Sequence, residues 1–249
     1  MSGYNGAVKT PVFSMTLLPL QPVAIAHTPF AEKFAIPRQP RLAPAARAVI
    51  ELLPPYDQPE ALAGLEQVSH IWLLFVFHQV AADNPQAPRL RVRPPRLGGN
   101  ETIGVFASRS THRPNGIGQS VVRLDKVEGT RLHVSGVDLA DGTPIVDIKP
   151  YVPYADCVTE ATNHIAPDAP ANLPVEWTPA AQQAAEQHGL RLHEDVAALV
   201  SQCLAQDPKP AYQKPDPQRR YGARFRDLNV VWHYPHEGVI CVLEITPAG

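Results

Sequence analysis

The sequence predicts a mainly β protein, with a strand-rich region over residues 21–156 followed by a small α+β region over 178–249. The 28 prolines among 249 residues interrupt long helices and so favour strands and loops. Short apolar runs also recur between turn-forming Asp-Gly, Glu-Gly and Pro-Asn-Gly steps, a pattern typical of a barrel or a sandwich. After Tyr151 the chain becomes rich in Pro, Ala and Asp before helical patterns begin, which predicts a boundary between two regions.

Residues 1–20 are expected to form an N-terminal tail, and 157–177 a connection between the two regions. The apolar runs predict strands at Val23–Ala26, Ala48–Leu53, His70–Phe77, Ile103–Ala107, Ser120–Leu124, Arg131–Val137 and Ile145–Ile148. The run HIWLLFVF at His70–Phe77 is apolar throughout, so this strand is expected to be buried on both faces.

In the C-terminal region, Thr178 and Pro179 predict the start of a helix, and Gly189 predicts its end. A second helix is expected from the apolar stripe Leu192, Val196, Leu199, Val200 and Cys203. Val230–Tyr234 and Val239–Ile245 are expected to pair as a closing hairpin.

The overall charge limits the partners that the chain could bind. The 22 Lys and Arg residues against 24 Asp and Glu residues leave a net charge of -2. Proteins that bind nucleic acid through bulk charge are usually basic, so a nucleic-acid surface on this chain has to be local.

Several common site types have no support in the sequence. The three cysteines are far apart and form no C-x-x-C, so neither a disulfide framework nor a metal site is expected. The P-loop, Rossmann, zinc-deaminase and α/β-hydrolase motifs are absent. The apolar run near the N-terminus is too short for a signal peptide or a membrane span, so a cytoplasmic protein is expected.

The segment Arg89–Gly118 combines six arginines with paired glycines and His112. Arginine offers a planar fork of donors suited to phosphates and carboxylates, and glycine lets the backbone approach a ligand closely. The segment therefore favours a site for an anionic ligand, although a solvated basic loop pair would have the same composition.

Other polar residues carry weaker signals. His78 and Gln79 follow the apolar strand, where they could read the edge of a heterocycle or serve as structural polar groups. Asp138, Asp141 and Asp147 lie in a stretch whose Asp-Gly step predicts a turn, so their carboxylates could simply bond nearby backbone. The basic aromatic stretch after Asp207 could be a solvated loop or a surface for single-stranded RNA.

Four runs, in order along the chain, resemble the TrmO-type tRNA methyltransferases, also called the TsaA-like or YaeB-like family. They are FAIPRQPRL, SHIWLLFVFHQ, RVRPPRLGGN with IGVFASRSTHRPNGIGQS, and DLADGTPIVDIKPYVPYAD. The resemblance covers residues 20–156 closely and reaches the C-terminal region through DPKPAY.

The resemblance implies a small N-terminal β-barrel that binds S-adenosylmethionine, and a homodimer with the cofactor near the subunit boundary. The implied reaction is methylation of N6 of N6-threonylcarbamoyladenosine at position 37, next to the anticodon of tRNA. The cofactor contacts carried over to this chain are Gln39, Pro40, Arg41, His78, Gln79, Arg109, Gly116, Ile117, Gly118, Gln119, Asp138, Leu139 and Ala140.

The attacking nitrogen belongs to a urea-like group and needs a proton acceptor, for which Asp141 and Asp147 are the candidates. The threonyl carboxylate of the substrate suits a bidentate arginine, and Arg93, Arg96 and Arg113 are the candidates for this role. Contacts to substrate and the anticodon stem-loop are expected from Arg93, Arg96, Arg113, Asp207, Lys209, Tyr212 and Arg220.

Two other functions remain open from the residues alone. One is an RNA-binding protein that responds to S-adenosylmethionine without catalysis. The other is a metal-free nuclease or phosphate-transfer enzyme using Arg109, His112 and Arg113.

Overall fold

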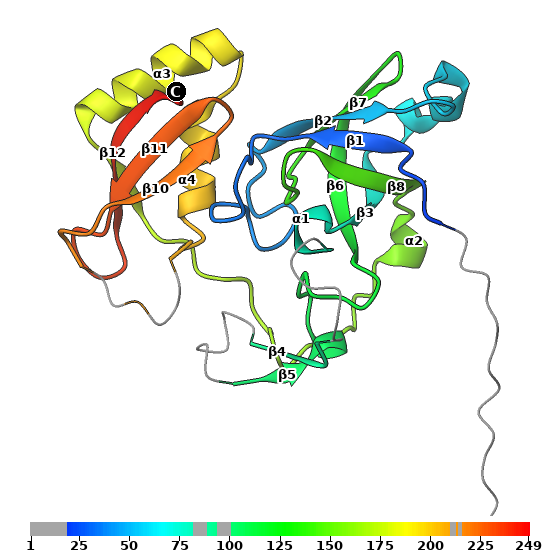
Figure 1. Cartoon of the computed structure of the whole chain (residues 1–249), viewed down its shortest axis with the longest axis horizontal. Helices are drawn as coiled ribbons and strands as arrows, with labels where there is room; N and C mark the ends of the chain where they lie inside the picture. Colours follow the sequence, from blue (N-terminus) through cyan, green and yellow to red (C-terminus); the bar gives the residue numbers. More distant parts are fainter. Residues whose placement is uncertain (1–18, 82–88, 94–100, 210–212, 214–215) are drawn as a thin grey trace, which may run out of the picture.

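Six antiparallel strands close into a barrel in the computed structural model, which describes residues 19–81, 89–93, 101–209, 213 and 216–249. The strand order around the barrel is β1-β2-β7-β6-β3-β8. The strands are β1 (Ala24–His27), β2 (Arg47–Leu52), β3 (His70–Val76), β6 (Ile117–Glu128), β7 (Arg131–Ser135) and β8 (Thr143–Pro150). The predicted mainly β fold with a barrel in the first region is confirmed (Figure 1).

Alternation along each strand fills the inside of the barrel. In β3, Ile71, Leu73 and Phe75 are buried, whereas the residues between them are only partly covered. The prediction that this strand is buried on both faces was therefore wrong. A small closed barrel has one packed interior, so the apolar residues on its outer face, such as Trp72, depend on cover from the chain that follows β8.

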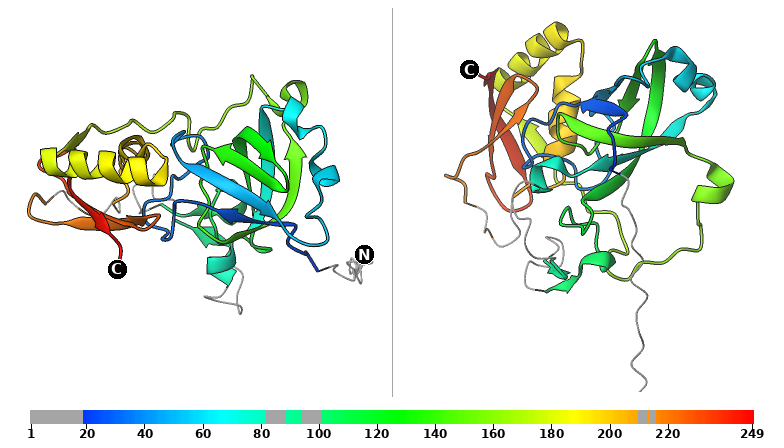
Figure 2. Two further views of the ribbon diagram at one scale, coloured as in Figure 1. Left: turned by 90° about the horizontal axis from the view of Figure 1, so that it is seen from above. Right: turned by 45° about the vertical axis from the view of Figure 1, so that its right-hand side comes forward.

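A two-stranded sheet of β4 (Arg91–Val92) and β5 (Ile103–Gly104) projects from the barrel (Figures 1 and 2). The expected strand Ile103–Ala107 is thus shorter than predicted, because Val105–Ala107 forms a 3-10 helix. Val105 is buried there, and its amide donates to the carbonyl of Leu90 at 2.9 Å. Shorter elements of the barrel region are 3-10 helices at Pro59–Leu62 and Leu65–Gln67, α1 (His78–Ala81) and α2 (Pro153–Asp156).

The C-terminal region is a four-stranded sheet with two helices on one face (Figure 2). The sheet order is β10-β11-β12-β9, with β9 parallel to β12 and the other pairs antiparallel. The elements are β9 (Val175–Trp177), α3 (Pro179–Leu192), α4 (Val196–Leu204), β10 (Tyr221–Phe225), β11 (Leu228–His233) and β12 (Ile240–Pro247). The expected closing hairpin is confirmed as β11 and β12.

The start of α3 matches the prediction, because the Thr178 hydroxyl accepts the Ala181 amide at 3.2 Å. Its predicted end at Gly189 was wrong. The helix continues to Leu192, so Leu192 belongs to α3 and not to the next helix. A Cβ on Gly189 would lie 2.8 Å from the Glu194 carbonyl oxygen, so the glycine permits a close return of the chain instead of ending the helix.

The basic aromatic stretch after Asp207 contains a strand that the sequence did not predict. Tyr221 and Phe225 of β10 are 7% and 1% exposed, and Tyr221 stacks on Trp232 at 6.1 Å. These rings belong to the core, so the interpretation of this stretch as a base-stacking surface was wrong for both residues.

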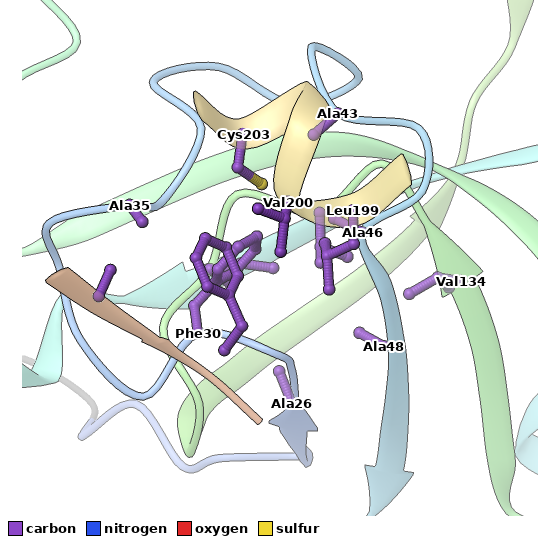
Figure 3. Packing of buried hydrophobic residues seen from close by; sticks show 14 of the residues in the cluster. Ala26, Phe30, Ala35, Ala43, Ala46, Ala48, Val134, Leu199, Val200 and Cys203 are labelled. Atoms are coloured by element: carbon purple, nitrogen blue, oxygen red, sulfur yellow. The ribbon is translucent and has the colours of Figure 1, made fainter. Parts of the chain in front are cut away.

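The two regions share one hydrophobic core (Figure 3). Phe30, fully buried, comes from the barrel region and forms a β-bridge with Phe225 of β10. Figure 3 shows it beside Val200 of α4. A backbone hydrogen bond also joins the C-terminal region to the barrel region, because the Arg226 amide donates to the Pro29 carbonyl at 2.8 Å.

Candidate functional site

Three predicted cofactor residues that are far apart in the sequence meet at one side of the barrel. Arg109 donates from Nη1 to Oε1 of Gln39 at 2.6 Å. Its charge also acts on Asp138, whose Oδ1 accepts a hydrogen bond from the Ser120 hydroxyl at 2.6 Å. An amide, a guanidinium, a carboxyl and a hydroxyl are therefore held together by the loop before β2, the loop before β6, β6 itself and the segment after β7.

The Asp138 carboxyl has an unusual acidity. Burial raises its pKa from 3.8 to about 6, while the bond from Ser120, its own backbone amide and the charge of Arg109 pull in the opposite direction. This carboxyl is therefore mostly ionised at neutral pH and becomes mostly protonated as the pH falls below about 6. Shifted carboxyls of this kind are typical of functional sites.

The loop that carries Gln39 and Pro40 is held against the end of β7 by its next residue. The Arg41 amide donates to the Gly136 carbonyl at 2.8 Å, and Arg41 itself has a positive φ of 68°. A Cβ on Gly136 would lie 3.2 Å from the Cα of Arg41, and Gly136 has a φ of 77°. Close approach of two backbones thus requires glycine at 136.

His78, Gln79 and the segment 116–119 lie side by side. The Phe77 amide donates to the Gly116 carbonyl at 2.7 Å, and Ile117 pairs with Val76, so α1 begins next to the start of β6. Lys33 donates to the Gln79 carbonyl at 3.3 Å. Gln119 is exposed and immediately precedes Ser120, which connects this group to Asp138.

Gly118 has a packing role. A Cβ at this position would lie 2.5 Å from the Phe75 ring and 2.7 Å from the Phe77 ring, which pack edge to face at 5.2 Å. The glycine therefore permits the aromatic pair inside the barrel, whatever it also offers to a ligand.

The remaining acidic segment is tied into the fold by hydrogen bonds. Thr28 donates from Oγ1 to the Leu139 carbonyl at 2.9 Å, and Thr143 donates to the Ala140 carbonyl at 2.7 Å. Asp141 accepts the Thr28 amide at 2.8 Å. Asp147 pairs with the Lys149 ammonium at 2.6 Å. Both candidate proton acceptors thus already have structural partners.

The predicted substrate arginines differ in their surroundings. Arg113 donates to the Ser108 carbonyl at 2.9 Å and to the Val105 carbonyl at 3.4 Å, so its fork holds the turn that follows β5. Arg93 is exposed. Arg96 lies outside the described residues.

The predicted C-terminal contacts form an internal network. Asp207 accepts the Lys209 ammonium at 2.6 Å and the Tyr234 hydroxyl at 2.8 Å. Burial and the neighbouring Asp207 raise the pKa of Tyr234. The Asp207 carbonyl also accepts from Arg38 at 3.3 Å, next to Gln39. Elsewhere, Arg220 pairs with Glu244 at 3.2 Å, and Tyr212 lies outside the described residues.

Sequence reasoning overlooked Ser120 and Gly136. Ser120 is a polar residue at an inward position of β6, between Gly118 and Val122, and that break in an apolar alternation was a detectable signal. Gly136 directly follows a predicted strand, where a turn glycine is expected, but its contact with Arg41 depends on the folded loop.

Within the described residues, no helix is long and apolar enough to cross a membrane. The same residues contain no group of three or more His, Cys, Asp or Glu side chains that could hold a metal ion.

Comparisons with known proteins match both regions. The tRNA-methyltransferase O N-terminal domain model matches residues 25–157, and the TrmO C-terminal domain model matches residues 170–248. The chain is 62% identical to the Pseudomonas aeruginosa PAO1 protein named "Putative S-adenosylmethionine-dependent methyltransferase RcsF" over 91% of this chain and 96% of that protein.

It is 41% identical to the tRNA (adenine(37)-N6)-methyltransferase of Escherichia coli K12, over 90% of this chain and 96% of the relative. The crystal structure of TrmO from P. aeruginosa superposes with a TM-score of 0.81 at 54% identity, covering 95% of this chain and all of that one. With both domain models matched in order, and relatives similar over nearly their full length, the chain belongs to the tRNA-methyltransferase O (TrmO) family.

Proposed function

We propose that this chain is an S-adenosylmethionine-dependent methyltransferase that methylates N6 of adenosine-37 in tRNA. The observation that carries the proposal is the meeting of Gln39, Arg109 and Asp138 at one side of the barrel, within a chain 41% identical to the E. coli tRNA (adenine(37)-N6)-methyltransferase. The P. aeruginosa relative's name, which includes S-adenosylmethionine, supports the choice of cofactor.

The residues present fit that cofactor. The amides of Gln39, Gln79 and Gln119 offer both donors and acceptors for an adenine edge. The guanidinium of Arg109 suits the methionyl carboxylate. The Asp138 carboxyl can accept hydrogen bonds from ribose hydroxyls, or the proton described below. When bound, S-adenosylmethionine supplies an electrophilic methyl group on a sulfonium.

Methyl transfer is an in-line displacement, so the protein acts largely by positioning the attacking nitrogen. That nitrogen must also lose a proton. Asp141 and Asp147 were proposed as acceptors from the sequence, and both remain candidates although each has a structural partner. We propose Asp138 ahead of them, because burial raises its pKa to about 6, near the neutral range in which a general base works best.

We further propose that the modified base is N6-threonylcarbamoyladenosine within the anticodon stem-loop. Its threonyl group carries a carboxylate that a planar guanidinium grips in two places. Of the three arginines proposed for this role, Arg93 is exposed, whereas Arg113 spends donors on two carbonyls of its own turn. Arg93→Lys keeps the positive charge but loses the planar two-point contact. It should therefore raise KM for the modified tRNA much more than the unchanged charge would predict.

The family resemblance also supports a homodimer acting in the cytoplasm, where tRNA substrates are found. Sedimentation of the full-length protein measures whether it is a dimer. A monomer that retains full activity would contradict the proposed dimer while leaving the reaction unaffected.

The test of the reaction is transfer of a labelled methyl group from S-adenosylmethionine to two tRNA pools, one carrying threonylcarbamoyladenosine and one lacking it. Label in the modified pool alone supports both the reaction and the substrate. Label in both pools supports methylation of adenosine-37 and contradicts the requirement for the threonylcarbamoyl group. Cofactor binding without label in either pool contradicts catalysis and favours an RNA-binding protein that responds to the cofactor.

A further inference from the structure

A cationic surface projects from the barrel beside the candidate site. We call it the cationic arm and define it as the described residues 89–93 and 101–113, which include β4, β5 and the 3-10 helix Val105–Ala107. Figures 1 and 2 show β4 and β5 away from the barrel wall. Two large apolar side chains in the arm are exposed, Leu90 at 70% and Phe106 at 75%.

The charge of the arm is one-sided. Glu101 is its only acidic residue. Its arginines are Arg89, Arg91, Arg93, Arg109 and Arg113. Among the described residues, none of these five forms an ion pair with a carboxylate. Their hydrogen-bond partners there are not carboxylates but a histidine ring nitrogen, backbone carbonyls and the Gln39 amide. A chain with a net charge of -2 thus concentrates positive charge in one place.

The exposed ring of Phe106 is held in place. The Arg113 guanidinium lies over it at 5.8 Å from the ring centroid, within cation–π range. Arg113 is fixed in turn by the carbonyls of Val105 and Ser108, and Val105 is buried. An aromatic ring fixed in this way loses little conformational entropy when a flat partner stacks on it.

We propose that the cationic arm binds unpaired nucleotides of RNA, with Arg89 and Arg91 on phosphates and Phe106 stacked on a base. The inference rests on the proposed function, which supplies a tRNA substrate. Arginines that track a phosphate backbone beside an exposed aromatic ring are the usual means of binding single strands. Arg109 also joins the arm to the Gln39–Asp138 group, so RNA held here lies next to the proposed methyl-transfer site.

Charge argues against a second copy of the chain as the occupant. In a two-fold interface centred on the arm the same patch would meet itself, which would bring five guanidinium groups toward five others. An RNA strand carries the complementary charge along its whole length.

The first test is the affinity of the full-length protein for a fluorescent anticodon stem-loop RNA, measured by anisotropy. Phe106→Ala should weaken binding about 5- to 150-fold, the range expected for loss of one stacked base, whereas Phe106→Tyr should bind as tightly as the wild type. Tyr154→Ala is the matched control, because Tyr154 is 92% exposed on α2, outside the arm. Affinity for S-adenosylmethionine should stay unchanged, as should affinity for fully double-stranded RNA of equal length.

The second test removes charge. Arg91→Gln should weaken RNA binding and lower the slope of log affinity against log salt by about 0.7, the value for one phosphate contact on a single strand. Arg131→Gln is the control, since Arg131 pairs with Glu51 on the barrel wall. Methyl transfer measured on the same preparations tests the proposed reaction separately from RNA binding by the arm.

A wild-type protein that methylates tRNA, with Phe106→Ala and Arg91→Gln binding RNA as tightly as it does, would overturn the inference and leave the proposed function standing. A wild-type protein that neither binds nor methylates tRNA would defeat the proposed function itself. If Phe106→Ala instead halves the molecular mass measured by sedimentation and keeps its RNA affinity, the arm is an interface between protein subunits and the inference is wrong.

Discussion

Replacing Asp138 with Asn should make the protein more stable at neutral pH while impairing its proposed activity. In the folded protein the pKa of Asp138 is raised to about 6, against 3.8 for an unperturbed carboxyl, chiefly because the group is buried. Ionising it at pH 7 therefore costs folding free energy. Asn has the same shape and its amide oxygen can still accept the Ser120 hydroxyl, so the substitution removes the charge with little change in packing.

The size of the effect follows from the two pKa values. Each pKa unit corresponds to about 1.4 kcal/mol, so the difference makes the ionised carboxyl cost about 3 kcal/mol of stability at pH 7. Because the folded pKa is the higher one, the folded state holds its proton more tightly. Wild-type stability should therefore fall as pH rises from about 4 to about 6 through this group, and stay level in that respect above it.

The assay is urea unfolding of the wild type and Asp138→Asn at several pH values from 4.5 to 8. The variant's advantage should be small at the acidic end and approach about 3 kcal/mol above pH 7. An equal difference at every pH would refute the reasoning, and so would a variant that is less stable than wild type at pH 8. The second outcome would show that the bond from Ser120 and the charge of Arg109 outweigh burial.

The other predictions concern packing and the junction between the regions. Gly118→Ala should lower the free energy of unfolding by about 1–3 kcal/mol, because its methyl group would overlap the aromatic pair inside the barrel. Gly104→Ala, which has no atom within 4 Å of the added Cβ, should change it little; equal losses would contradict the packing argument. Arg226→Gln should cost about 1–3 kcal/mol, since this residue pairs with the largely covered Glu194 inside the C-terminal region and donates to the Arg47 carbonyl across the junction. Arg191→Gln breaks a solvent-exposed pair and should cost less stability than Arg226→Gln, so a larger loss at Arg191 would refute the role assigned to Arg226.

The barrel could be predicted because its information is local. Residues 131–135 alternate between outward and buried side chains, and the turn after them begins with a glycine, so a strand and its end follow from a short window. Strand β10 shows where that window fails. Tyr221 and Phe225 also alternate with other residues, yet whether such rings face water or a core depends on Trp232 and Phe30, which are distant in the sequence.

The residues of the candidate site could also be predicted from the sequence, but the contacts between them could not. Resemblance identified Gln39, Arg109 and Asp138 as residues of interest, but their connection requires closure of the barrel and is invisible in any one segment. The acidity of Asp138 arises from burial, which no local pattern reports. The end of α3 was mispredicted for a similar reason: Gly189 is explained by the approach of Glu194 after the chain has reversed.

The shared core bears on how members of such a family could be recombined. The loop over residues 28–46 precedes β2 in the chain, yet Phe30 lies against β10, the Ala45 amide donates to Gln202 of α4 at 2.7 Å, and Arg38 reaches Asp207. In a chimera joined between β8 and β9, this loop would have to pack against the C-terminal region of another family member. Because the loop also carries Gln39, a mismatched graft would disturb a barrel whose own strands were left untouched. The natural crossover unit is therefore the C-terminal region together with this loop.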